Sequence, residues 1–282
     1  MAAGDARTNQ IHVLELKKAH VRDLASIIKA ISFRENATFQ ATPQGMRILV
    51  DDHHCQQAIA YLSNDLFSSF TLRERSVHFR IPLRVITDCI SMHTSSGATL
   101  KMTYDGAGEP VVIILEEDGI VFDINVKTLT TEEVLDFEFD ADDVTFQVIM
   151  KSYMLKEAIK ELDASSSTVT LSVSNDELSL TTTGEIGKAV TRFPRHSDQI
   201  ERLECAEPVV HQYPVNLIRQ MTAAFAIASK VEMFCVDGGL LLLQTHLFSK
   251  IKVKIMRLVN KLFLKTSSSH SSEAWTYLMA SA

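Results

Sequence analysis

Apolar residues recur along the chain in two rhythms, and the change from one to the other marks the predicted elements. Val21, Leu24, Ile28 and Ile31 follow the 3.6-residue period of a helix, which predicts one over His20–Ile31. Alternating apolar and polar residues are typical of strands. In the first half, this alternation predicts strands at His12–Leu16, Ala37–Ala41, Met46–Val50, Cys55–Leu62, Ala98–Tyr104 and Pro110–Glu116, with one extended stretch at Ser69–Ile81 before a helix from Pro82 to about Met92.

The second half repeats this order. A shift of 132 positions places Pro82 on Pro214, and the apolar positions around the two prolines coincide. Self-similarity at a fixed offset indicates two copies of one structural unit. The second copy is predicted to contain strands at Thr145–Met150, Thr168–Ser174, Glu177–Thr183, Ile186–Phe193, Val209–Tyr213, Lys230–Val236 and Leu240–Thr245, with helices at Tyr153–Leu162 and from Pro214 to about Ala226.

The predicted fold class is α+β, with two similar domains that each carry antiparallel sheets and two helices on one face. We expect a flexible tail at residues 1–10, a first domain at 11–126, an interdomain linker at 127–143, a second domain at 144–247 and a divergent C-terminal segment at 248–282. The linker is poor in large apolar residues. Its carboxylates are Glu132, Glu133, Asp136, Glu138, Asp140, Asp142 and Asp143.

Composition favours an intracellular protein. Nothing approaches the run of about 20 apolar residues that a membrane helix needs, and the N-terminal stretch lacks the apolar core of a signal peptide. Cys55, Cys89, Cys205 and Cys235 show no C-x-x-C spacing, so free thiols are expected rather than disulfides or a zinc site. The net charge of −7 argues against nucleic acid only if the charges are evenly spread.

The cations are not evenly spread. Each of the four predicted helices carries a cation opposite its apolar stripe, so the exposed helix sides together would form a basic surface that holds phosphates by charge. The alternative is that these are ordinary solvated helix faces. The residues predicted to face DNA are Arg22, Lys29, Arg84, Lys156, Lys160 and Arg219.

Several spaced segments resemble one family. The run G-M-R-I-L-V-D-D-H-H-C-Q-Q-A-I-A-Y-L-S-N-D-L-F at Gly45–Phe67 is similar to eukaryotic sliding clamps, as is Leu178–Phe193 with its G-E-I-G turn. Ile27–Phe39 and Val134–Phe139 more closely resemble the Rad-one subunits of nine-one-one checkpoint clamps, relatives of proliferating cell nuclear antigen. The resemblance extends from about residue 14 to about residue 247.

This resemblance implies a DNA-clamp fold and a non-catalytic role without a cofactor. It implies a heterotrimeric ring with a Rad-nine-like and a Hus-one-like subunit, loaded in the nucleus by an ATP-driven clamp loader onto double-stranded DNA without sequence specificity. It also implies that helices line the hole and that the edge strands Pro110–Glu117 and Glu185–Phe193 contact the neighbouring subunits. The expected contact residues are Pro110, Val112, Ile113, Ile114, Leu115, Glu185, Ile186, Lys188, Ala189, Val190 and Arg192.

Two other functions fit parts of the sequence. The linker carboxylates could hold Mg²⁺ for a 3′–5′ exonuclease, and a homotrimeric replication clamp would share the fold. The sequence contains no G-x-x-x-x-G-K-[ST], G-x-S-x-G or H-E-x-x-H motif. His53 and His54 are adjacent, and neighbouring side chains of an extended chain point to opposite faces, so they are not expected to share a metal ion.

The C-terminal segment departs from the family pattern. From Phe248 the sequence reads F-S-K-I-K-V-K-I-M-R-L-V-N-K-L-F, and six cations lie between Lys250 and Lys265. Residues Lys250–Met256 alternate as a half-buried strand does. We therefore predict that they pair with Leu240–Thr245, with outward lysines protecting an exposed sheet edge.

Overall fold

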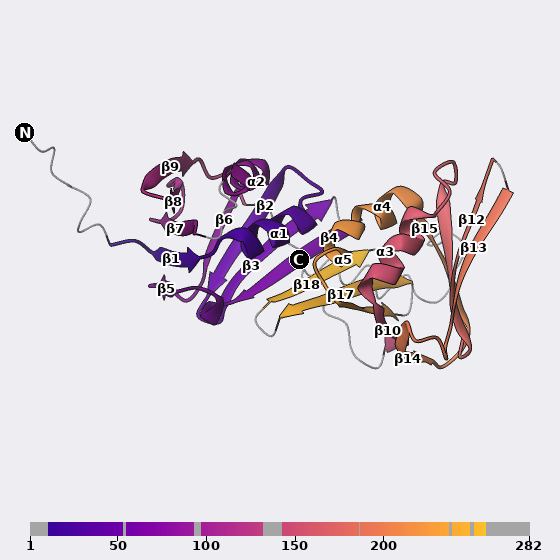
Figure 1. The fold of residues 1–282 in the computed structure, drawn as a ribbon. Coiled ribbons are helices and arrows are strands. Elements are labelled where there is room, and N and C mark those ends of the chain that lie inside the picture. The colour runs from indigo at the N-terminus through magenta and orange to yellow at the C-terminus, as the bar shows by residue number, and fades with distance from the viewer. Residues whose placement is uncertain are drawn as a thin grey trace, which may run out of the picture.

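The computed structural model describes residues 11–52, 55–92, 97–131, 143–185, 187–236, 239–248 and 251–257. Its strands and short helices fall into two halves that lie side by side, and the helices gather on one side of the strands (Figure 1). This arrangement is the predicted α+β clamp fold. The predicted tail at 1–10 and most of the predicted linker and divergent end lie outside the described residues, and the proposed domain boundaries stay predictions.

The first half begins with a strand and a helix and continues mainly as strands. Its elements are β1 (Leu14–Ala19), α1 (Arg22–Ile31), β2 (Asn36–Thr42), β3 (Gly45–Asp52), β4 (Gln56–Ser63), the 3₁₀ turn η1 (Asn64–Leu66), β5 (Ser69–Leu72), β6 (Val77–Pro82), α2 (Leu83–Met92), β7 (Thr99–Tyr104), β8 (Val111–Glu117) and β9 (Ile120–Val126).

The second half follows the same order. Its elements are β10 (Val144–Lys151), α3 (Ser152–Lys160), β11 (Thr168–Val173), β12 (Glu177–Gly184), β13 (Gly187–Pro194), β14 (Ile200–Cys205), β15 (Val209–Pro214), α4 (Val215–Gln220), α5 (Thr222–Phe225), β16 (Lys230–Val236), β17 (Leu240–Phe248) and β18 (Ile251–Arg257).

The strands form three antiparallel sheets. A five-stranded sheet has the order β5-β1-β7-β8-β9, and a four-stranded sheet has the order β13-β12-β11-β15. Between them lies a nine-stranded sheet with the order β14-β10-β16-β17-β18-β4-β3-β2-β6. This central sheet takes five strands from the second half and four from the first, so it joins the two halves.

The helices form because their apolar residues share one side. Leu24, Ile27, Ile28 and Ile31 of α1 are at most 5% exposed, whereas Lys29 faces solvent. The helix prediction for this segment is therefore confirmed. Packing against α2 and α5 extends the same buried layer from one half to the other.

Some predicted element boundaries were wrong. Ser69–Ile81 is two strands in different sheets, β5 beside β1 and β6 beside β2, because the polar run at 73–76 interrupts the alternation. The strand β14 was missed. The helix after Pro214 is split at Met221, beside which the Thr222 hydroxyl donates to the Arg219 carbonyl oxygen at 2.6 Å.

The strand β9 was also not predicted, and for that reason the edge of its sheet was wrongly expected at β8. Glu117 pairs with Ile120 across a two-residue turn in which Asp118 and Gly119 have φ of 51° and 79°. Positive φ at both central residues is the geometry that Asp-Gly favours in tight hairpins. The chain therefore reverses after β8 and adds one more strand.

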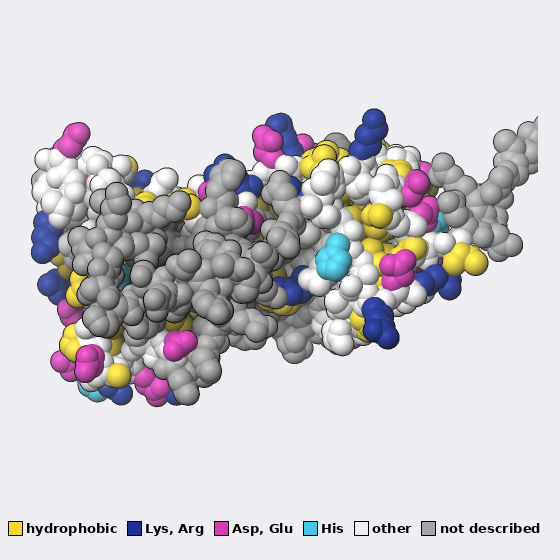
Figure 2. Space-filling model, turned by 180° about the vertical axis from the view of Figure 1, so that it is seen from behind, with side chains coloured by type: hydrophobic (Ala, Val, Ile, Leu, Met, Phe, Trp, Pro, Cys, Tyr) yellow, Lys and Arg dark blue, Asp and Glu magenta, His cyan; other side chains and the backbone are white. Residues whose placement is uncertain are grey.

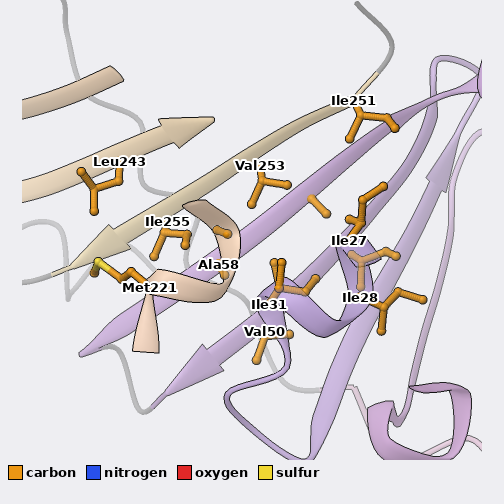
Figure 3. Close-up of a cluster of buried hydrophobic side chains, with 14 of the residues drawn as sticks. Ile27, Ile28, Ile31, Val50, Ala58, Met221, Leu243, Ile251, Val253 and Ile255 are labelled. Atoms are coloured by element: carbon orange, nitrogen blue, oxygen red, sulfur yellow. The ribbon is translucent and has the colours of Figure 1, made fainter. Parts of the chain in front are cut away.

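The C-terminal strand β18 pairs with β17 as predicted, but it is not an edge. Its other side pairs with β4 of the first half over the whole register from Ile251↔Leu62 to Arg257↔Gln56. Ile251, Val253 and Ile255 are at most 2% exposed. Figure 3 shows their side chains on the same side of the sheet as those of α1, where they close the core between the two halves.

The opposite side of the molecule carries no comparable layer of helices among the described elements. In Figure 2, the visible described surface has cations and carboxylates interspersed, without a patch of one sign. Within the described residues, no helix is long and apolar enough to span a membrane. All four cysteines are free thiols, as expected, and only Cys55 is exposed.

Candidate subunit and nucleic-acid interfaces

Each outer sheet has two end strands, β5 and β9 in one and β13 and β15 in the other, and β9 and β13 are the candidate contact edges. The strand β9 ends the five-stranded sheet, and β13 ends the four-stranded sheet; each pairs on one side only with another described strand. Ile120 and Val121 of β9 are 67% and 61% exposed, although they are apolar. An unpaired edge with exposed apolar residues is a template for pairing with another chain.

The expectation that Pro110–Glu117 forms an unpaired edge is wrong. Pro110 precedes β8, and Val111–Glu117 forms that strand, which pairs with β7 on one side and β9 on the other, so its backbone hydrogen-bonding groups are already used. Ile113 and Leu115 are completely buried. The contact residues expected on this strand, which also include Pro110, Val112 and Ile114, therefore do not lie on a sheet edge.

The edge at Glu185–Phe193 lies where the sequence predicted it. The strand β13 pairs only with β12 among the described strands, and Lys188, Ala189 and Arg192 are exposed while Val190 is partly exposed. Glu185 belongs to the turn before β13, and Ile186 lies outside the described residues. Arg192 contacts Glu177 of the neighbouring strand at 3.4 Å.

Charges of opposite sign surround the two edges. Glu116, Asp118 and Asp123 lie on or beside β9, whereas Lys188 and Arg192 lie on β13. Glu185 also lies in the turn before β13, and Arg192 is paired with Glu177, so the positive charge of the β13 edge is partly compensated.

The exposed sides of α1 to α5, called here the helix face, carry the cations that the sequence singled out. Arg22 and Lys29 are exposed and have no ion pair within the described part of the chain. Arg84 pairs with Asp88 at 3.4 Å, and Lys160 pairs with Glu157 at 2.6 Å. The hydrogen bond from Lys160 holds the pKa of the Glu157 carboxyl below its usual range.

The other two cations are less exposed. Lys156 is half-buried, and the guanidinium of Arg219 donates a hydrogen bond to the carbonyl oxygen of Leu162 just beyond α3. Arg219 thus serves the end of a helix, which the sequence did not reveal. Four carboxylates share the helix face with the six cations, so its excess of positive charge is small: Asp23, Asp88, Glu157 and Glu161.

Most of the residues considered as metal ligands lie outside the part of the chain that the structure describes. Of the linker carboxylates only Asp143 is described, and His53 and His54 are not. Within the described ranges no three His, Cys, Asp or Glu side chains lie close enough together to hold a metal ion. The arrangement that the described residues do provide is one of open strand edges and a layer of helices.

Comparison with known proteins agrees with this geometry. Residues 13–247 match the family model described as repair protein Rad1/Rec1/Rad17. The cell cycle checkpoint protein RAD1 homolog mrt-2 of Caenorhabditis elegans is 35% identical over 238 residues, covering 84% of this chain and 89% of its own. The cell cycle checkpoint proteins RAD1 of Mus musculus and Homo sapiens are each 37% identical over 232 residues, covering 80% of this chain and 83% and 82% of their own.

Proposed function

Because this chain belongs to the Rad1/Rec1/Rad17 family of repair proteins and is a clamp subunit of the DNA-damage checkpoint, we propose that it acts without catalysis and closes a ring of three clamp-like chains by taking one neighbour at β9 and another at β13. The observation that carries this proposal is the ladder between β18 and β4. This ladder joins the two repeats within one chain by the same kind of strand pairing that we propose between neighbouring subunits.

The two strands of the β18–β4 ladder correspond, through the internal repeat, to the two edge strands β9 and β13. The strand β18 is the counterpart of β9, and β13 is the counterpart of β4, both at an offset of 131 positions. A neighbour that supplies its own β13-like strand to β9 would extend the five-stranded sheet by four strands. The product would have the strand order of the central nine-stranded sheet.

The register follows from the same comparison. Within the chain, Ile251 of β18 lies opposite Leu62 of β4. Transferred by 131 positions, this pair places Ile120 of β9 opposite the position of Phe193 in a β13-like strand. Ile120 would then leave solvent and join an apolar layer continuous with Phe122 and Ile124, which already pack against the core.

The neighbours are proposed to be a Rad-nine-like and a Hus-one-like chain. Double-stranded DNA would pass through the ring along the helix face, without recognition of sequence, after loading by an ATP-driven clamp loader in the nucleus. The exposed cations Arg22, Lys29, Arg84 and Lys160 on the helix face support contact with phosphates. Exonuclease activity and a homotrimeric replication clamp are not favoured, because the relatives carry the names of checkpoint proteins.

The substitution Ile120→Glu tests the β9 contact. The side chain is 67% exposed, so a charge there should not destabilise the free subunit. In the ring it would bury that charge in an apolar layer, and we expect loss of one neighbour with retention of the other. Val210→Glu on β15 is the matched control, since Val210 is 64% exposed and lies on neither proposed contact edge.

Co-expression followed by native mass spectrometry gives the readout. Two different clamp-like chains bound to the wild-type subunit support the proposal, and a homotrimer would replace it with the replication-clamp alternative. Normal assembly of Ile120→Glu with both neighbours would remove β9 as a contact edge.

A further inference from the structure

A network of short polar side chains connects the end of α3 with the turn between β12 and β13. The backbone N–H and the hydroxyl of Ser165 both donate to Oδ1 of Asp163, each at 2.8 Å. The Ser165 Oγ in turn accepts a hydrogen bond from the backbone N–H of Glu185 at 2.9 Å. Glu185 lies in the turn that leads into the β13 edge.

The network is fixed from both sides. The N–H of Asp163 donates to the Thr182 hydroxyl of β12 at 3.3 Å, and Thr182 is 1% exposed. On the other side, the Arg219 guanidinium donates to the carbonyl oxygen of Leu162, the residue immediately before Asp163. The loop after α3 is thereby tied to α4 and to β12 at once.

Gly184 shows how closely the parts fit. A Cβ atom added there would lie 1.9 Å from Oδ2 of Asp163 and 2.3 Å from Oγ of Ser165. Any larger residue at this position would displace the carboxylate or the hydroxyl. The last residue of β12 is therefore glycine because the network occupies the space of a side chain.

We propose that Asp163, Ser165 and Gly184 anchor the β12–β13 turn and so position the start of the β13 edge for the neighbouring subunit. The inference rests on the proposed function. The strand β13 pairs only with β12 among the described strands, so its first residues depend on how the turn is held. By the transferred register, these same residues, Gly187 to Ala189, meet the neighbour's counterpart of β9.

This inference gives Arg219 another role. Its side chain supports the anchor through Leu162, so it is a positioning residue for the subunit contact rather than a phosphate contact. The Glu185 N–H is the only direct bond of the network to the turn among the described residues. The Ser165 hydroxyl is accordingly the link whose removal should act most selectively.

Binding of the purified chain to each neighbouring subunit separately tests the anchor. Ser165→Ala should weaken binding to the neighbour at β13 by about 3- to 10-fold, as expected for one hydrogen bond, and leave the neighbour at β9 unaffected. Gly184→Ala should weaken the same contact by at least roughly tenfold through overpacking. The neighbour that Ile120→Glu loses identifies the β9 contact.

Three controls separate positioning from loss of fold. Ser165→Thr keeps the hydroxyl and should bind both neighbours normally. Ser167→Ala removes an exposed hydroxyl that makes no hydrogen bond within the described residues, and it should have no effect. The Asp163→Ala change combined with Gly184→Ala should recover part of the binding that Gly184→Ala alone loses, because it removes the carboxylate that holds the nearest clashing atom and leaves only the contact with Ser165 Oγ.

Equal loss of both neighbours in Ser165→Ala and Gly184→Ala, or normal binding of both, would overturn the anchor. Failure of the wild-type chain to bind either neighbour would instead overturn the proposed ring. The two failures are therefore distinguishable in one set of measurements.

Discussion

At the scale of single residues, hydrogen bonds from a backbone N–H and from a serine hydroxyl lower the pKa of one carboxyl group. The Ser165 N–H, its hydroxyl and then the nearby Arg219 charge keep the pKa of Asp163 below the usual range for aspartate. A group whose pKa is lowered by folding stabilises the folded state when it is ionised. Asp163 is therefore ionised, and its network intact, at neutral pH.

The pH dependence of the network follows from this sign. Its contribution is fully present above about pH 4, the ordinary aspartate range, and disappears as the pH falls through the lower folded pKa. Exchange of the Glu185 amide, corrected for intrinsic rates and followed by NMR, should accelerate only below about pH 4. Asp163→Asn should lose this pH dependence; a loss of protection between about pH 5 and 7 would point to a different group.

At the scale of elements, β18 is the strand that turns two sheets into one. It pairs along its length with β17 and β4, and its inward residues complete the core against α1 (Figure 3). A strand paired on both sides should exchange its amides as slowly as its neighbours. The family match ends at Leu247, so this strand lies beyond the matched residues.

Ile255→Ala tests the contribution of β18 to stability. Ile255 is 2% exposed, and truncation of such a residue should lower the free energy of unfolding by roughly 2–5 kcal/mol. Urea denaturation followed by circular dichroism measures the change. Val210→Ala, at an exposed position, should change it by less than about 0.5 kcal/mol. Equal effects of the two changes would mean that β18 does not belong to the cooperative core.

Most elements are predictable from the sequence because their periodicity is clear. The exceptions are strands marked mainly by a turn motif and pairings between residues far apart in the chain. Asp118-Gly119 is a strong hairpin signal, and β9 could have been identified from it or as the counterpart of β18. Likewise, β14 occupies the same place in the second repeat as β5 does in the first, so the two strands could have been identified together. The β18–β4 pairing was not predictable from alternation alone, because alternation specifies a face but not a partner.

The candidate site was predictable to a similar extent. The positions opposite the apolar stripe of each helix were predicted to be exposed, and the cations Arg22, Lys29, Arg84 and Lys160 there are exposed. This pattern did not reveal the hydrogen bond of Arg219, since only the folded chain brings that guanidinium to the Leu162 carbonyl oxygen. Helical periodicity indicates which side faces solvent, but it cannot reveal a contact between two helices.

At the scale of the whole molecule, the question is whether the helix face holds DNA despite its carboxylates. Reversal of Arg22, Lys29, Arg84, Lys156 and Lys160 to Glu should abolish retention of the assembled ring on closed circular DNA and leave assembly intact. Each lost phosphate contact should reduce the slope of log affinity against log salt concentration by about 0.9.

Lys17→Glu is the control for this charge reversal. Lys17 is exposed on β1 next to the inward Leu16, so its side chain lies on the face of the sheet away from the core and helices. Retention should stay normal in this variant. If the variant with all five charge reversals is retained on DNA as well as the wild type, the helix face is not the surface that contacts DNA.

The ladder between β18 and β4 has a consequence for how a ring would come apart. Its two strands belong to one covalent chain, so they meet at an effective concentration that dilution cannot change, on the order of millimolar for short flexible connections. A β9 edge and a neighbour's strand meet only at the concentration of free subunits. Contacts of the same geometry would therefore differ in persistence, and a diluted ring would open between subunits while each subunit kept its two halves together.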